Sequence, residues 1–182
     1  MAKSIKHRVL INQKARKSNT NKATNHSKKI LLFLVKFFVI FAVAQTLIEF
    51  APLAPLNNTI TEISASALGL ESLRSDVVVG EGVFSVTNSC TGLVSVSILG
   101  AIIFSLRKPR LRKKLALFLA GAIIIMLINI PRIMLVLFAA KIGFNAELVH
   151  ELTWFLMSAI ILIIWYYGTK RMEKIKEFRE LL

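Results

Sequence analysis

The chain has 182 residues, of which 55% are hydrophobic, and it carries 24 lysines and arginines against 10 aspartates and glutamates. A soluble domain is about 45–50% apolar, so this apolar excess beside a net charge of +14 excludes a soluble nucleic-acid-binding protein with a basic coat. The single cysteine excludes an intrachain disulfide scaffold. Basic and apolar residues must be segregated along the chain, which is typical of a membrane protein.

Basic residues dominate the first part of the chain. Residues 1–29 contain nine lysines and arginines and no acidic residue, and they have no apolar periodicity. We therefore expect a disordered basic tail over residues 1–29. An arm that binds nucleic acid or a protein partner is one interpretation. A solvated cytoplasmic tail that also contacts anionic lipid is favoured, because membrane insertion requires positive flanks.

Four apolar segments follow this tail, at residues 30–48, 89–106, 115–130 and 148–167. A helix needs about 20 residues to cross about 30 Å of hydrocarbon. The third segment approaches this length by continuing past Pro131 and Arg132 to about residue 140. The sequence therefore predicts an all-α polytopic membrane bundle with about four transmembrane helices, forming a transmembrane domain over residues 30–168.

The first span has an alternative interpretation. Ala42-Val43-Ala44 resembles a signal-peptidase site after a basic region and an apolar run, and cleavage there would leave three spans. A basic region of 29 residues is long for a secretory signal, and the apolar run continues to Ile48. We therefore favour four spans.

The distribution of charge orients these spans, because clusters of Lys and Arg stay in the cytoplasm. The loop Arg107–Lys114 has six basic residues in eight, and the segment 169–182 is also basic, so both should lie in the cytoplasm. We expect residues 169–182 to form a helix there. The segment Glu49–Ser89 has five acidic residues and one arginine, which places it outside. Four spans with both termini in the cytoplasm satisfy all of these clusters.

The external segment between the first two spans has its own pattern. Ile60–Leu73 has apolar residues at helical spacing, which predicts a helix on the membrane surface. Val77–Val86 is rich in β-branched residues around Gly80-Glu81-Gly82, which predicts a short hairpin leading into the second span.

The lone cysteine, Cys90, lies at the outer start of the second span. Asn88 and Ser89 can cap that helix, which puts Cys90 in its first turn, where the helix dipole favours the nucleophilic thiolate. The alternative is that Cys90 is a small buried hydrophobic residue.

Two polar residues interrupt the third apolar segment. Arg132 lies between apolar runs of 16 and eight residues, with no acidic residue near it in sequence. A charge so close to hydrocarbon is costly and is usually functional or paired, although an arginine that snorkels to the interface is the alternative. Asn129 lies deeper in the same helix, where it can cap a break at Pro131 or bond a neighbouring span.

His150 lies at the outer start of the fourth span. Its ordinary pKa of about 6.5 suits proton transfer at neutral pH. A metal site is not expected, because His7 and His26 belong to the cytoplasmic tail and no outer His or Cys other than Cys90 exists to join His150. A cysteine nucleophile, a histidine base and an arginine that stabilises an oxyanion fit acyl transfer through a thioester.

At these residues the chain resembles the exosortase/archaeosortase family of multi-pass membrane proteins. The matching motifs are Cys90-Thr91-Gly92, Asn129-Ile130-Pro131-Arg132-Ile133 and His150-Glu151-Leu152-Thr153-Trp154, in the order of the family's proposed triad, within residues 77–167. The resemblance implies that Cys90 is the nucleophile, Arg132 the oxyanion or substrate-positioning residue and His150 the general base and acid. Asn88 and Asn129 are expected in supporting roles, with no cofactor and no metal.

The resemblance also implies a function. Family members recognise exported proteins that end in a short motif, a hydrophobic helix and a basic cluster, cleave near the motif and pass the new carboxyl group to a membrane or surface acceptor. The chain is thus expected to be a cysteine protease or transpeptidase of the cell membrane, with its active site at the extracytoplasmic face and no nucleic-acid partner. It departs from many members in having four spans rather than about eight, and in Thr153, where the family often has glycine.

Two other function classes stay open from the sequence. One is a non-enzymatic membrane assembly or transport subunit, in which Arg132 and His150 line a polar path. The other is a cysteine-dependent membrane acyltransferase, which would need no peptide signal. A co-encoded protein with the tripartite C-terminal tail would favour the peptidase.

Overall fold

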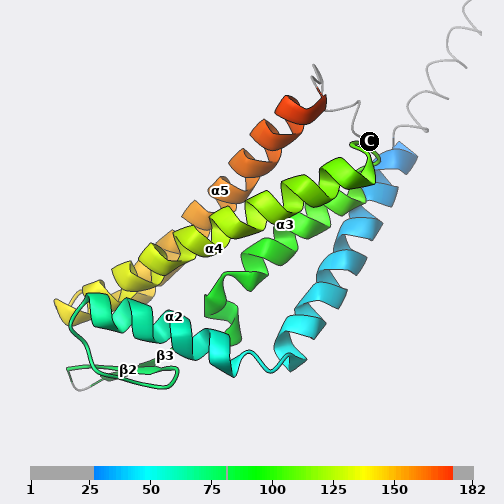
Figure 1. Ribbon diagram of the computed structural model, residues 1–182. Helices are drawn as coiled ribbons and strands as arrows, with labels where there is room; N and C mark the ends of the chain where they lie inside the picture. The colour runs from blue at the N-terminus through cyan, green and yellow to red at the C-terminus, as the bar shows by residue number, and fades with distance from the viewer. Residues whose placement is uncertain (1–26, 81, 174–182) are drawn as a thin grey trace, which may run out of the picture.

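The computed structural model describes residues 27–80 and 82–173, which form a bundle of helices with a small sheet at one end (Figure 1). The helices are an N-terminal helix Ser27–Phe50, α2 Ala54–Ala67, the short 3₁₀ helix η1 Asn88–Thr91, α3 Leu93–Ser105, α4 Leu111–Lys141 and α5 Ala146–Glu173. The strands are β1 Ser72–Leu73, β2 Asp76–Val79 and β3 Gly82–Ser85. The expected helical membrane bundle with an inserted helix and hairpin is thereby confirmed in outline.

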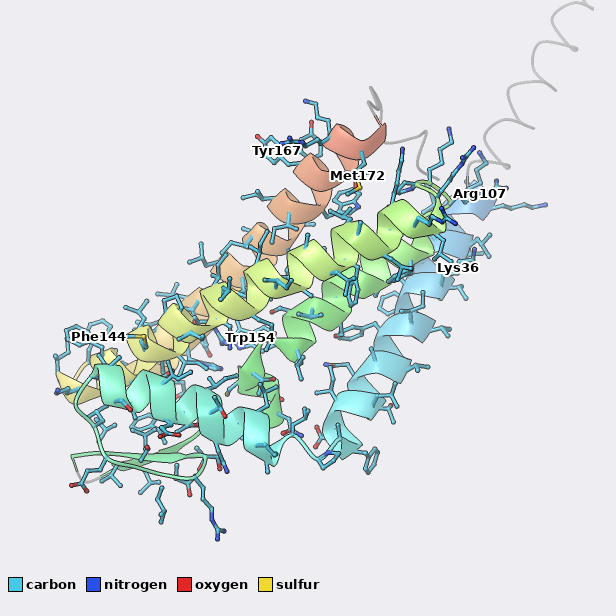
Figure 2. All side chains as sticks on the ribbon, viewed as in Figure 1. Lys36, Arg107, Phe144, Trp154, Tyr167 and Met172 are labelled. Carbon is cyan, nitrogen blue, oxygen red and sulfur yellow. The ribbon has the colours of Figure 1, made fainter. Side chains whose placement is uncertain are left out.

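The bundle has two chemically different ends. Helix α2 and the strands lie at one end, which we call the hairpin end, and Phe144 in the α4–α5 connection lies at this end too (Figure 2). The start of the N-terminal helix, the α3–α4 loop around Arg107 and the last turns of α5 lie at the other, which we call the basic end (Figures 1 and 2). Lys113 Nζ donates to the carbonyl of Met172 at 2.9 Å and joins α4 to α5 there.

Among the described residues, three helices are long and apolar enough to cross a membrane: Ser27–Phe50, Leu111–Lys141 and Ala146–Met172. The prediction that residues 89–106 form a single membrane-spanning helix is wrong. Helix α3 has only 13 residues and starts at Leu93, because Gly92 adopts φ +86° and separates it from η1. At 1.5 Å per residue, α3 covers only about 20 Å of the membrane.

Helix α4 runs through Pro131 without a break and has 31 residues, so the predicted continuation to about residue 140 is confirmed. The proline ring lies on the exposed side of the helix, away from the neighbouring helices. The helix begins at Leu111, so the second half of the predicted loop Arg107–Lys114 is helical. Its length of about 46 Å exceeds the hydrocarbon thickness of about 30 Å, so α4 must project beyond the apolar layer.

The predicted hairpin is present, and it belongs to a three-stranded antiparallel sheet of order β1-β2-β3. Val77 pairs with Phe84 and Val79 with Gly82. Strand β1 was not predicted, because two residues are too short to show a period of two. Helix α2 lies about six residues earlier than the predicted Ile60–Leu73, and Gly69 at φ +62° follows its end.

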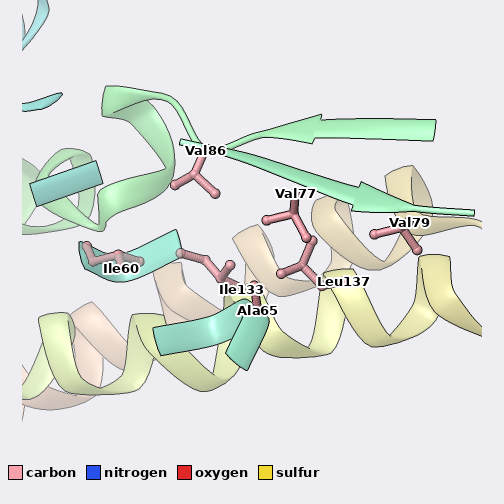
Figure 3. Close-up of a cluster of buried hydrophobic side chains, with 7 residues drawn as sticks. All are labelled: Ile60, Ala65, Val77, Val79, Val86, Ile133 and Leu137. Carbon is pink, nitrogen blue, oxygen red and sulfur yellow. The ribbon is translucent and has the colours of Figure 1, made fainter. Parts of the chain in front are cut away.

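Two apolar clusters hold these elements together. The first lies between the sheet, α2 and α4, and consists of Ile60, Ala65, Val77, Val79, Val86, Ile133 and Leu137 (Figure 3). The second joins α3, α4 and α5 through Val96, Leu99, Ile103, Leu117, Ile125, Met157 and Ile161. Gly121 lets α3 and α4 approach, because a Cβ there would lie 2.5 Å from Leu99 Cδ2. Asn129 and Arg132 lie on α4 between the two clusters.

The N-terminal helix is attached more loosely. The most apolar stretch of this helix has no buried side chain, which suits a helix surrounded by lipid. Residues 1–26 of the tail predicted over residues 1–29 lie outside the described residues. Its last three residues, Ser27–Lys29, are helical. Residues 169–173 of the helix predicted over residues 169–182 are helical as the end of α5, and residues 174–182 lie outside the described residues.

Candidate active site

A cavity of about 270 Å³ lies at the hairpin end, between β3, α4 and the start of α5. Its lining residues are Phe84, Ser85, Val86, Cys90, Arg132, Ile133, Val136, Leu137, Ala146, Glu147 and His150. The three residues expected to form a triad therefore lie on one cavity, although they come from η1, α4 and α5. Most of the remaining wall is apolar, so a polar group of a ligand would find few partners there except these residues, Ser85 and Glu147.

Cys90 is half-buried in η1, and its Sγ lies 3.6 Å from Thr87 Oγ1. Its predicted place in the first turn of an α-helix is wrong, because Gly92 separates η1 from α3. Asn88 does not cap a helix either. It accepts a hydrogen bond from Asn57 Nδ2 at 2.9 Å and donates to the carbonyl of Ile48 at 3.1 Å, so it ties η1 to α2 and to the N-terminal helix.

Asn129 positions the backbone that carries the cysteine. Its Nδ2 donates to the carbonyl of Cys90 at 2.7 Å, and its Oδ1 accepts from Arg132 at 3.2 Å. The side chain is almost fully buried, at 1% exposure. Gly92 makes this approach possible, because a Cβ on it would lie 3.1 Å from both Cβ and Cγ of Asn129.

Arg132 is buried, with 9% exposure, so its predicted alternative as a snorkelling surface arginine is wrong. Its Nε donates to Thr153 Oγ1 at 3.1 Å, one terminal nitrogen donates to Asn129 Oδ1 and the other lies 3.4 Å from His150 Nδ1. None of these partners is a carboxylate. A guanidinium has five N–H groups, so two of them have no partner within residues 27–80 and 82–173.

His150 lies between two groups that can only donate hydrogen bonds. Trp154 Nε1 donates to His150 Nε2 at 3.1 Å, and the Arg132 guanidinium faces His150 Nδ1 at 3.4 Å. A neutral imidazole has one acceptor nitrogen, whereas an imidazolium has none. The surroundings in this structure therefore suit a neutral ring, which can accept from Trp154 or from Arg132 but not from both at once.

Two residues one turn after His150 complete the network, and the sequence analysis did not assign them a role. Thr153 Oγ1 donates to the carbonyl of His150 at 2.8 Å and accepts from Arg132. The ring of Trp154 lies 5.7 Å from Arg132 Cζ, within the range of a cation–π contact. Their spacing of three and four residues after His150 places them on the same helix face, which is the signal that could have identified them.

This arrangement offers a thiol nucleophile, a neutral base and a positive charge on one cavity. A buried charge without a counter-ion favours the arrival of an anion or of a developing negative charge. Among the described residues, no group of three or more His, Cys, Asp or Glu side chains is placed to hold a metal ion.

Comparison with known proteins identifies relatives of the chain. The family model described as "Transmembrane exosortase (Exosortase_EpsH)" matches residues 23–166, which is more than half of the chain. A protein of Methanocaldococcus jannaschii described as "Probable archaeosortase D" is 26% identical over 154 residues, which cover 82% of this chain and 95% of the relative. No solved structure matches the chain significantly.

We expect Gly92→Ala to disturb the site more than an equivalent change at an open glycine. A side chain at positive φ costs about 1–2 kcal/mol, and at Gly92 it also displaces Asn129 from the carbonyl of Cys90. Gly143→Ala is the matched control, because Gly143 has φ +75° and a Cβ there would have nothing within 4 Å. Thermal unfolding in detergent and the alkylation rate of Cys90 measure the difference. Equal losses of stability with unchanged alkylation would show that the Gly92–Asn129 contact has no importance.

Proposed function

Because the chain belongs to the transmembrane exosortase family, we propose that it is a membrane-embedded cysteine protease or transpeptidase that cleaves a C-terminal sorting signal of exported proteins. The new carboxyl group is passed to a membrane or surface acceptor. The relative described as a probable archaeosortase supports the same class of function. Within the structure, the proposal is carried by buried Arg132, whose described partners are all uncharged and which lines one cavity with Cys90 and His150.

The proposed orientation places the hairpin end outside the cell and both termini in the cytoplasm. The chain is a membrane protein with several apolar spans, and most of the Lys and Arg residues that the structure describes lie at the basic end, as the positive-inside rule requires. A substrate with an external motif, an apolar helix and a basic tail would then lie parallel to the bundle. Its cleavage motif would reach the level of the cavity.

The proposed reaction begins with the thiol of Cys90. The acceptor nitrogen of neutral His150 exchanges its hydrogen bond from Trp154 or Arg132 for one from the thiol and takes the thiol proton. The sulfur then attacks the carbonyl carbon of the scissile peptide. The two N–H groups of Arg132 that lack described partners stabilise the oxyanion that forms. The C–N bond then breaks, the amine leaves with the proton from His150, and the acyl group stays on Cys90 as a thioester.

The second half of the reaction regenerates the enzyme. An acceptor amine or hydroxyl gives its proton to His150 and attacks the thioester, and the sulfur leaves. The two donors beside His150 disfavour a long-lived imidazolium. Each proton that the ring takes is therefore returned quickly, to the leaving amine or to the departing sulfur.

The first test is processing of a co-expressed tailed protein. We expect Cys90→Ala to abolish the mass change of the substrate, because the thiol is lost, and Cys90→Ser to be nearly inactive, because a hydroxyl is a poorer nucleophile. Ser89→Ala is the matched control, since Ser89 is an exposed neighbour in η1. Full processing by Cys90→Ala would exclude the peptidase and leave a non-enzymatic membrane subunit as the better explanation.

A second prediction concerns the charge at the site. Arg132→Lys should lower the processing rate by about a hundredfold or more, the loss that follows removal of one oxyanion-stabilising group. An ammonium cannot reproduce the planar fork that reaches Thr153 and Asn129 at once. Arg112→Lys is the control on the same helix, because Arg112 is exposed. A wild-type rate in Arg132→Lys would remove Arg132 from the reaction.

A third prediction concerns orientation. Reporter fusions after Arg110 and at the C-terminus should read cytoplasmic, whereas fusions at Gly69 and Gly143 should read external, because only this arrangement keeps the basic end inside. An external reading after Arg110 would put the cavity on the cytoplasmic face, where a sorting signal of an exported protein could not be cleaved.

A further inference from the structure

The outer edge of β3 is open in the described part of the chain. The sheet order is β1-β2-β3, so β3 has a partner strand on one side only. Val78 donates its N–H to the carbonyl of Glu71, away from β3, so Val77 and Val79 direct their backbone groups toward β3. Their partners are Phe84 and Gly82.

The alternating hydrogen-bond pattern of antiparallel strands then determines which backbone groups of β3 face its open edge. The backbone N–H and C=O groups of Gly82 and Phe84 point toward β2, and the N–H of Val86 points the same way, to the carbonyl of Ser75 at 2.8 Å. The backbone groups of Val83 and Ser85 must point the other way. Both residues are exposed, so this edge can receive another extended chain.

This edge leads directly to the candidate nucleophile. Phe84, Ser85 and Val86 form one wall of the cavity, and Cys90 lies on the same cavity five residues after Ser85. Arg132 and His150 lie on the cavity as well. A chain lying beside β3 would therefore pass the thiol, the guanidinium and the imidazole.

The strand is also a rigid support. Val77 and Val79 of β2, and Val86 just after β3, are buried in the first apolar cluster against α4, as Figure 3 shows. The edge is therefore fixed relative to Arg132, which belongs to the same helix. A peptide aligned on it would be held at a defined distance from the reacting groups, which is the geometric requirement for an efficient attack.

We propose that β3 binds the substrate as a fourth strand, by pairing the backbone groups of Val83 and Ser85 with an extended segment that contains the scissile bond. This inference rests on the proposed function and specifies how its substrate is bound. Backbone pairing gives affinity without regard to sequence, and alternate side chains give specificity. Because the wall formed by Phe84, Val86 and Ile133 is apolar, the side chains that point into the cavity should be apolar.

The test uses the full-length enzyme in detergent with a purified tailed protein as substrate. Val83→Pro removes the N–H at the open edge and leaves the β2–β3 ladder intact, since proline is tolerated at such positions. Val83→Ala is the matched control, because it shortens the side chain and keeps the N–H. We expect Val83→Pro to lower kcat/KM about tenfold, as the loss of one backbone hydrogen bond predicts. Val83→Ala should lower it less, because its N–H is kept. Alkylation of Cys90 should be unchanged in both, which shows an intact site.

A second measurement leaves the backbone unchanged and covers the case in which Val83→Pro does not fold. A photo-crosslinking residue at position 83, in a Cys90→Ala background, should capture the uncleaved substrate. The same residue at position 73 should not, because Leu73 is exposed on β1, at the opposite edge of the sheet. If the wild type does not process the substrate, the proposed function fails. If the wild type does process the substrate, an unchanged kcat/KM in folded Val83→Pro, or no crosslink at position 83, would overturn the proposed pairing with β3 and leave the proposed function standing.

Discussion

Arg132 carries a guanidinium that is buried without a carboxylate, and this charge organises the groups around the cavity. The residue is 9% exposed, and its described partners are an amide, a hydroxyl and an imidazole. The effective cost of burying a single ion is several kcal/mol, and these neutral acceptors offset part of it. Each partner is thereby fixed by the same charge, because moving any one of them leaves an N–H group unsatisfied. The charge remains incompletely compensated, which favours an anion or an oxyanion on the adjacent cavity.

The two apolar clusters make this arrangement rigid. Asn129, Arg132, His150 and Thr153 form a polar layer between these clusters. Met157 and Ile161 hold α5 against α4 on one side of this layer, and Ile133 and Leu137 hold α4 against the sheet on the other. Asn129 extends the layer to η1 through the carbonyl of Cys90. Cys90, His150 and Arg132 are thus attached to one network, although the peptide chain places them far apart. Such preorganisation is what an acyl-transfer site requires, because its dipoles need not reorganise during the reaction.

The shortness of α3 and the presence of the sheet have a common consequence for the site. Since α3 starts only at Leu93, η1 and the cavity lie at the hairpin end, beside the sheet rather than inside a complete helical span. The open edge of β3 then borders the cavity, where α-helices alone would offer no free backbone groups. For the proposed peptidase, this combination would give a substrate both an extended partner and access to Cys90.

The long apolar helices, the hairpin and the candidate residues could be predicted from the sequence, because length, hydropathy and β-branching act over a few neighbouring residues. The second span was wrong as a single helix, and α2 lies about six residues earlier than predicted. Charge patterning likewise predicted which ends of the helices lie together, as the N-terminal helix, the α3–α4 loop and α5 show at the basic end. The break at Gly92 could not be predicted, since it depends on the approach of Asn129 from another helix. The same holds for the partners of Asn88 and the roles of Thr153 and Trp154. A hydrogen bond between side chains on different helices leaves no periodic trace along one chain, so these contacts follow from tertiary packing.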